Sequence, residues 1–125
     1  MTNAYIYARC ATIDQSEETT TPKSIKQQFS RCKKYAKEHH YRITGTFKDI
    51  ATSGNTFFRH GLGELYQSCI YNNINHVLVT NYDRVARDIV TYHYLKRLFE
   101  KSSIKFIAVD NPSERFFTID LLSIQ

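Results

Sequence analysis

Residues 5–15 have the sequence YIYARCATIDQ, an apolar stretch that ends in an arginine and continues into polar residues. Consecutive Tyr, Ile and Ala residues are typical of a strand buried in a parallel sheet. Arg9 then stands at the end of that strand, where a guanidinium group can bind an anion. The stretch therefore predicts a buried first strand that delivers a cation into a polar loop.

Strand and helix patterns alternate along the rest of the chain. Strand patterns cover residues 4–9, 41–47, 76–81 and 104–110. Helical spacing of apolar residues covers 24–40, a short segment at 62–70, and roughly 84–102. Ser24 and Gln27 form a capping box at the first helix start. The alternation predicts an α/β domain with a largely parallel, four- to five-stranded sheet flanked by helices, and 125 residues with 42% hydrophobic content suffice for one core.

Polar residues follow three of the four predicted strands. The first strand ends at Arg9, and the second runs into a loop that holds Asp49, Ser53 and Arg59. The third is followed by NYDRVARD at residues 81–88. Because ligands of a parallel sheet bind at the carboxyl ends of its strands, these groups are expected at one edge.

The NYDRVARD stretch contains a possible phosphate site of its own. Arg84 and Arg87 are three residues apart at the expected start of the third helix, so they are expected to share one face. Asp83 occupies the position of an N-cap carboxylate. Helix-start amides with two guanidinium groups suit a phosphate. The alternative is that the arginines are solvated or paired with neighbouring carboxylates, and that Asp83 only caps the helix.

Composition narrows the class of partner. The chain carries 17 Lys and Arg against 12 Asp and Glu, a net charge of +5, which favours a phosphate-bearing partner without requiring one. Cys10, Cys32 and Cys69 are widely spaced, which indicates neither a disulfide framework nor a zinc site. No run is long and apolar enough for a membrane span, and no signal peptide is present, so we expect a cytoplasmic protein with no membrane partner.

Five motifs, taken in order, resemble the amino-terminal catalytic domain of the serine recombinases, the resolvase and invertase family: YARCAT, SIKQQ, FKDIATSG, RHGLGEL and NYDRVARD. The similarity extends from about Tyr5 to Asp110. It implies phosphoryl transfer on double-stranded DNA without a metal, a nucleotide or another cofactor. In that family a serine attacks the scissile phosphate, a phosphoserine forms on the 5′ side, and strands are exchanged within a tetramer and then rejoined.

The resemblance also implies roles for individual residues. Arg9, Arg59, Arg84 and Arg87 would surround the phosphate, and Asp83 would orient an arginine or help to move a proton. Residues implied to support the site are Tyr7, Gln15, Gln28, Asp49 and Ser53.

Ala11 departs from the family pattern. The motif is Tyr-x-Arg-x-Ser, whereas this sequence has Tyr7, Arg9 and Ala11. A methyl group cannot attack phosphorus, so we expect the chain to be inactive in DNA cleavage. Ala11 is an engineered substitution, or a natural feature of a degenerate or regulatory copy, or Cys10 or Thr12 replaces the serine. The last is least favoured, because a shift of one residue in an extended segment reverses the side-chain direction.

A further apolar pattern follows Pro112 and reaches Gln125. The resemblance implies that the long dimerisation helix of the family begins here. We therefore expect residues 1–125 to be a catalytic domain truncated near the start of that helix, with the DNA-binding domain absent. By family habit the source is a prokaryotic mobile element or phage. The alternatives are a non-catalytic DNA- or phosphate-binding or regulatory module with the same fold, and an unrelated α/β protein that binds a phosphorylated small molecule.

Overall fold

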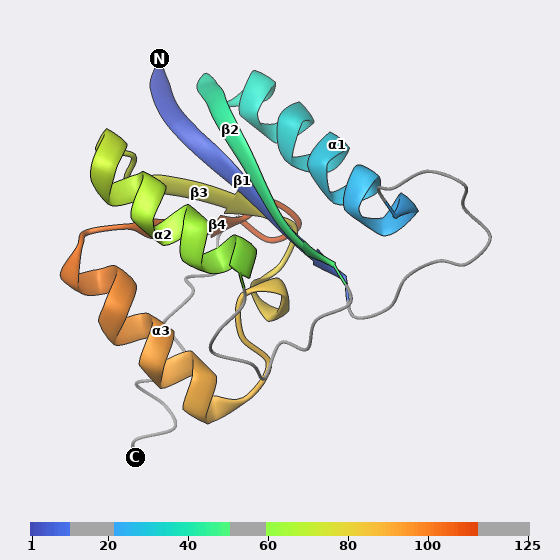
Figure 1. Ribbon diagram of the computed structural model, residues 1–125. Coiled ribbons are helices and arrows are strands. Elements are labelled where there is room, and N and C mark those ends of the chain that lie inside the picture. Colours follow the sequence, from blue (N-terminus) through green and yellow to red (C-terminus); the bar gives the residue numbers. More distant parts are fainter. Residues whose placement is uncertain (11–21, 51–59, 113–125) are drawn as a thin grey trace.

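The computed structural model describes residues 1–10, 22–50 and 60–112. In chain order the elements are β1 (Thr2–Cys10), α1 (Lys23–Glu38), β2 (Tyr41–Ile50), α2 (His60–Asn72), β3 (His76–Val79), the 3₁₀ helix η1 (Tyr82–Arg84), α3 (Ile89–Lys101) and β4 (Lys105–Ala108). The four strands are parallel and lie in the order β2-β1-β3-β4 (Figure 1). The predicted α/β class with a parallel sheet is confirmed.

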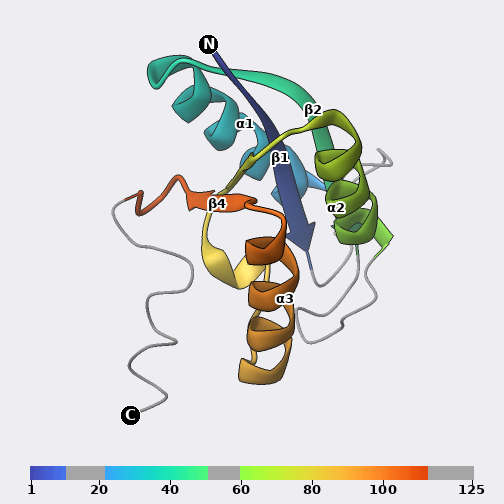
Figure 2. The ribbon, with the colours of Figure 1, turned by 90° about the vertical axis from the view of Figure 1, so that its left-hand side faces the viewer.

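Helices cover both faces of the sheet. Helix α1 lies on one face, and α2 and α3 lie on the other (Figures 1 and 2). Strand β1 is central, and it is buried at every position from Ala4 to Cys10. Tyr5 and Tyr7 pack in the cluster that contains the buried side chains of α2 and α3, whereas Ile6 packs with Cys32 and Ala36 of α1. The continuous apolar run is therefore explained by two covered faces.

Strand β1 extends beyond its partner β3 at the carboxyl end. It pairs with β2 from Thr2 to Cys10, but with β3 only at Tyr5 and Ile6. Strand β3 was expected to continue to residue 81, but it ends at Val79, because the chain then turns into η1. The last residues of β1 consequently have one edge without a neighbouring strand, and side chains occupy that edge instead.

The predicted third helix begins later than expected. Arg84 belongs to η1, and α3 starts at Ile89, so the prediction that Arg84 and Arg87 share the first turn of one helix is wrong. The N-cap is Asp88 and not Asp83: the Asp88 carboxylate accepts hydrogen bonds from Thr91 N at 2.9 Å and from Thr91 Oγ1 at 2.7 Å. A carboxylate thus occupies the helix start where the sequence predicted a phosphate.

The first helix also starts differently. It begins at Lys23, after Pro22, whose fixed φ suits the first turn. Ser24 was expected to be the N-cap, but it lies inside the helix and its hydroxyl accepts a 3.1 Å hydrogen bond from Gln28 Nε2. Its hydroxyl thus helps to orient Gln28 rather than to cap the helix.

We expect Asp88→Ala to destabilise the protein by about 1 kcal/mol, because the amide of Thr91 loses its cap. Asp88→Asn is the matched control, since an amide oxygen also caps but does not titrate. Hydrogen bonds from Thr91 lower the pKa of Asp88. The charge-dependent advantage over Asp88→Asn is therefore present above the ordinary pKa of about 4 and is lost as the pH falls through the lowered value. Urea unfolding between pH 3 and 7, roughly spanning that window, measures both effects. An Asp88→Ala variant as stable as the wild type would contradict the assignment.

Candidate functional site

Arg9 is almost fully buried, with 1% of its surface exposed. It was expected at a strand end in a polar loop, but it lies within β1, and its guanidinium reaches across to η1. Nε donates to the main-chain oxygen of Arg84 at 3.1 Å, and Nη2 donates to that of Asp83 at 3.0 Å. A buried cation is therefore stabilised by two carbonyl oxygens, and the turn that follows β3 is held against β1.

Arg84 returns the same kind of contact. Its Nη1 donates to the main-chain oxygen of Arg9 at 3.2 Å. Each arginine thus binds the backbone of the other. This reciprocal pair, which we call the arginine clasp, joins the end of β1 to η1. It brings together two of the predicted cations from segments 75 residues apart.

Gln28 completes the unpaired edge of β1. Its Oε1 accepts from Arg9 N at 3.2 Å, and its Nε2 donates to Arg9 O at 3.0 Å. The side-chain amide therefore pairs with the backbone of Arg9 as a neighbouring strand would. Because Gln28 is itself buried on α1, the helix and the clasp are fixed relative to each other.

Asp49 binds the start of α2 to the sheet. Its carboxylate is buried and accepts from Gly61 N at 2.7 Å, from Leu62 N at 2.9 Å and from the Tyr7 hydroxyl at 2.7 Å. The charge thus meets the positive end of the helix and two otherwise unpaired amides. Asp49 and Tyr7, both predicted as supporting residues, are brought together, and together they connect β1, β2 and α2.

Gly61 allows this close approach. A Cβ atom at Gly61 would lie 2.1 Å from the main-chain oxygen of Lys48 and 3.0 Å from Asp49 Oδ1. No side chain fits in that space. Gly61 belongs to the RHGLGEL motif, and the close approach of Lys48 gives the physical reason for a glycine at that position.

The remaining predicted residues divide into two groups. Asp83 and Arg87 are exposed at η1 and at the approach to α3, and Asp83 Oδ1 lies 4.0 Å from Arg84 Nε. Predicted site residues outside the described part of the chain are Ala11, Gln15, Ser53 and Arg59. The described residues therefore form two hydrogen-bonded groups, Arg9 with Gln28, Asp83 and Arg84, and Tyr7 with Asp49. The two groups adjoin because Arg9 of β1 is the register partner of Asp49 of β2.

Two side-chain oxygens at the end of β3 were missed by sequence reasoning. Thr80 Oγ1 and Asn81 Oδ1 are buried, and neither has a hydrogen-bond partner within the described ranges. Buried polar atoms are normally satisfied by protein or water, so these oxygens mark a polar position beside η1. The pattern of the predicted strand gives no signal for them, since threonine is common in buried strands.

Metal binding and thiol reactivity depend on the placement and burial of the described His, Cys, Asp and Glu side chains. No group of three His, Cys, Asp or Glu side chains there is arranged to hold a metal ion. Burial raises the pKa of both Cys32 and Cys69 to about 12, with the Asp110 charge adding to the effect at Cys32, so both are protonated thiols at neutral pH. Within the same ranges no helix is long and apolar enough to cross a bilayer.

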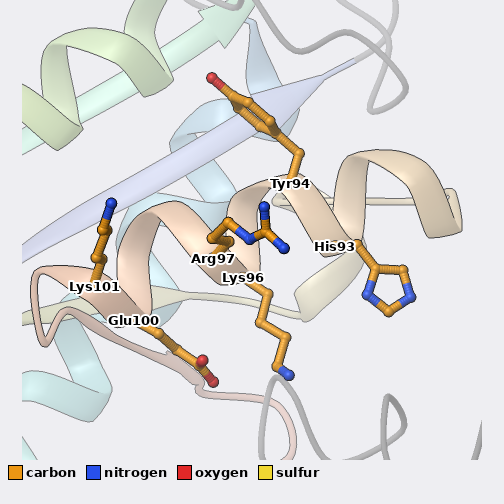
Figure 3. A pocket seen from close by; sticks show the side chains of 6 residues that line it. All are labelled: His93, Tyr94, Lys96, Arg97, Glu100 and Lys101. Atoms are coloured by element: carbon orange, nitrogen blue, oxygen red, sulfur yellow. The ribbon is translucent and has the colours of Figure 1, made fainter. Parts of the chain in front are cut away.

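A hollow of about 900 Å³ lies elsewhere, on the outer side of α3. The side chains that line it are His93, Tyr94, Lys96, Arg97, Glu100 and Lys101. They come from one helix and point in different directions, with Tyr94 and Glu100 on opposite sides (Figure 3). None of the predicted site residues that the structure describes is among these, and the groups do not converge, so the arginine clasp is the better candidate.

The sequence matches the family model described as Resolvase, N terminal domain, over residues 4–123. The chain belongs to this family, and it has the fold of a serine recombinase catalytic domain. Among proteins with curated descriptions, none matches the sequence.

Solved structures agree with the family. The N-terminal catalytic domain of TP901-1 integrase superposes with a TM-score of 0.77 at 28% identity, covering 98% of this chain and 90% of that one. The C-terminal catalytic domain of ISC1926 TnpA, an IS607-like serine recombinase, gives 0.70 at 26% identity, covering 98% and 77%. A resolvase family site-specific recombinase from Streptococcus pneumoniae gives 0.75 at 23% identity, covering 99% and 85%, and supports the fold.

We expect Gly61→Ala to destabilise the protein by about 1–3 kcal/mol, the usual range for a forced clash in a packed site. Gly63→Ala is the matched control, because nothing lies within 4 Å of a Cβ there. Since alanine is favoured over glycine inside a helix by about 1 kcal/mol, the control should be more stable than the wild type. Thermal unfolding measures the stability of both variants, and an equal change in stability in the two would contradict the close approach of Lys48 to Gly61.

Removal of the buried guanidinium should loosen η1. Arg9→Met leaves carbonyl oxygens of Asp83 and Arg84 without their donors, at an expected cost of about 1–3 kcal/mol for an unsatisfied buried group. Arg87→Met is the control, since this exposed side chain should change stability by less than about 0.5 kcal/mol. Hydrogen exchange at the amide of Val85, which donates to Tyr82 O at 2.9 Å, reports directly on η1. Unchanged protection of that amide in Arg9→Met would contradict the clasp.

Proposed function

We propose that this chain is the catalytic domain of a site-specific serine recombinase in which Ala11 removes the attacking oxygen. The observation that carries the proposal is the arginine clasp directly before position 11. Arg9 is the last but one residue of β1, and Ala11 follows the strand. Position 11 is therefore two residues after Arg9, whose backbone and guanidinium are held in the clasp.

The chemistry of the family suits this arrangement. A serine oxygen forms a bond to phosphorus while the bond to the 3′ oxygen breaks, and the phosphodiester energy is kept in the phosphoserine. Charge develops on the phosphoryl oxygens, so fixed guanidinium groups that need no reorganisation stabilise the transition state. We assign that role to Arg84 and Arg87, together with Arg59. Arg9, which is occupied with two carbonyl oxygens, acts mainly by holding Arg84 in place.

The supporting residues act through the same backbone. Gln28 fixes Arg9, and Asp49 fixes the start of α2, close in sequence to Arg59. Asp83 lies beside Arg84 and orients it. In this proposal the partner is double-stranded DNA, the working assembly is a dimer that forms a tetramer, and residues 1–125 are the catalytic part of a longer cytoplasmic protein.

A second function is favoured by Ala11 alone. Without a nucleophile, the same domain would bind DNA phosphates and regulate an active relative without cleaving. The two functions predict different results when a serine hydroxyl is introduced at position 11. Only a catalytic domain then regains covalent attachment to DNA.

We expect Ala11→Ser to restore covalent attachment to DNA in a chain that continues through the long helix and a DNA-binding domain. The substrate is a nicked duplex carrying the cognate site, and a denaturing gel detects protein joined to the 5′ end. The same variant with Arg87→Met should react about 10²–10³-fold more slowly, as expected for loss of one stabilising donor. The unchanged chain is the negative control. No adduct from Ala11→Ser, or an adduct of the unchanged chain through Cys10 or Thr12, would overturn the proposal.

A further inference from the structure

Helix α1 accounts for the whole net charge of the protein. Its sixteen residues contain five lysines, one arginine and one glutamate, which is a net charge of +5. The entire chain also has a net charge of +5, from 17 basic and 12 acidic residues. The residues outside α1 therefore contain eleven of each sign and are neutral in sum. The positive character of this protein is the property of one helix.

The five lysines lie on one side of that helix. They are Lys23, Lys26, Lys33, Lys34 and Lys37, and all are exposed. At 3.6 residues per turn they fall within an arc of about 100°, and Lys23 and Lys37 are separated by about 21 Å along the axis. The buried positions of α1 are Ile25, Gln28, Cys32 and Ala36, which fall on the opposite arc against the sheet. We call the exposed row the lysine stripe. Helix α1, which carries it, lies on the face of the sheet opposite to α2 and α3 (Figure 1).

The lysine stripe is unfavourable for the isolated fold. Lys33 and Lys37 are like charges at a spacing of four, and such a pair destabilises a helix by about 0.2–0.5 kcal/mol. Glu38, four residues after Lys34, is the one acidic residue of the helix and cannot balance five lysines. The first turn contains no acidic residue, so Lys23 and Lys26 also lie near the positive end of the helix dipole. A helix surface that serves only solubility usually mixes both signs. The energetics therefore favour an external anionic partner.

The other basic features of the protein do not share this arrangement. Arg31, the remaining cation of α1, is paired with Asp110 at the end of β4. Helix α3 carries Lys96, Arg97 and Lys101, but Glu100 lies among them, and its basic side chains point in different directions (Figure 3). Helix α3 therefore carries basic residues that do not form a continuous row of positive charge, and it serves as a control surface for the lysine stripe.

We propose that the lysine stripe binds the phosphate backbone of duplex DNA outside the recombination site, an inference that rests on the function proposed above. The stripe starts at Lys23, close to Gln28, which hydrogen-bonds Arg9, and runs away from the arginine clasp along the sheet. DNA held at the clasp can therefore continue along α1. With one phosphate charge per 1.7 Å of duplex, a row of about 21 Å spans roughly six base pairs. The lysine ammonium is a compact charge and lacks the planar set of donors that arginine uses for bidentate contacts. It therefore suits contacts to phosphates, which position a duplex but do not read its bases.

The test measures binding of the 125-residue chain to a labelled duplex of random sequence by fluorescence anisotropy at several salt concentrations. The α1 variant combines Lys33→Gln, Lys34→Gln and Lys37→Gln. A matched variant combines Arg97→Gln, Lys101→Gln and Lys105→Gln, three exposed cations outside α1. Both lose three charges, so a general charge effect would weaken both alike. A third variant with arginine at positions 33, 34 and 37 keeps the charge.

We expect the α1 glutamine variant to bind at least about tenfold more weakly, with a log-log salt slope shallower by about 2–3, since each lost phosphate contact removes about 0.9. The matched variant should stay within about threefold of the wild type, and the arginine variant should bind as the wild type does. Because removal of like charges relieves repulsion, the α1 variant should be folded, and its far-ultraviolet circular dichroism checks this. Three results would overturn the proposal that the lysine stripe binds DNA: an equal loss of affinity in both glutamine variants, no loss of affinity in the α1 variant, or no binding by the wild type.

Two further measurements separate this inference from other outcomes. Vesicles of phosphatidylcholine with phosphatidylserine test a membrane surface, and tighter binding to them than to DNA would overturn the proposal. The α1 substitutions, added to Ala11→Ser in the longer chain, should raise the DNA concentration needed for adduct formation and leave the yield at saturation unchanged. If the adduct forms at the same DNA concentration with and without the α1 substitutions, DNA binding by the lysine stripe is refuted and the recombinase function is not affected. Absence of any adduct from Ala11→Ser would instead refute that function.

Discussion

The buried guanidinium of Arg9 is the contact on which the candidate site depends. A charge at the end of the central strand is tolerated because two main-chain oxygens of η1 accept from it. Those oxygens in turn are fixed only because the chain leaves β3 early and turns over the end of β1. Arg84 then donates back to Arg9, so neither arginine can move without the other. A buried guanidinium, like a buried ion pair, needs hydrogen-bond partners in place of water, and main-chain oxygens of η1 supply two of them.

A second set of hydrogen bonds, around Asp49, joins the neighbouring strand β2 to α2. Asp49 binds the first amides of α2, and Tyr7 binds Asp49, so the start of α2 is fixed to two strands at once. Tyr7 and Arg9 are alternate residues of β1 and therefore project to the same side. One face of β1 thus supplies two of the side chains that organise the site, and Asp49 of β2 and Arg84 of η1 bind to them or to their backbone.

The sequence was informative wherever a pattern extended over several residues. Alternating strands and helices gave the parallel sheet, and the ordered motifs pointed to the recombinase family. It failed at η1, because Tyr82 to Arg84 have no periodicity of their own, and the helical spacing around Ile89 was extended back over them. Asp83 and Asp88 both have a β-branched apolar residue within the next two positions, so local sequence does not distinguish the true cap from the false one. Arg9 was placed within one residue of the true strand end at Cys10, but its burial could not be predicted, since the accepting carbonyl oxygens belong to a segment 75 residues away.

The strand order also has a consequence for synthesis of the protein. Strand β1 is apolar on both faces, yet β3, its neighbour on one side, begins at His76, which is 66 residues after Cys10. At about 5–20 residues per second on a ribosome, the central strand spends several seconds with that edge unpaired. During this interval only α1, β2 and α2, which precede β3 in the chain, can cover the strand, and the part of its face that later meets α3 is exposed to other nascent chains. The residues that organise the finished site therefore belong to the segment most in need of protection while the chain is being made.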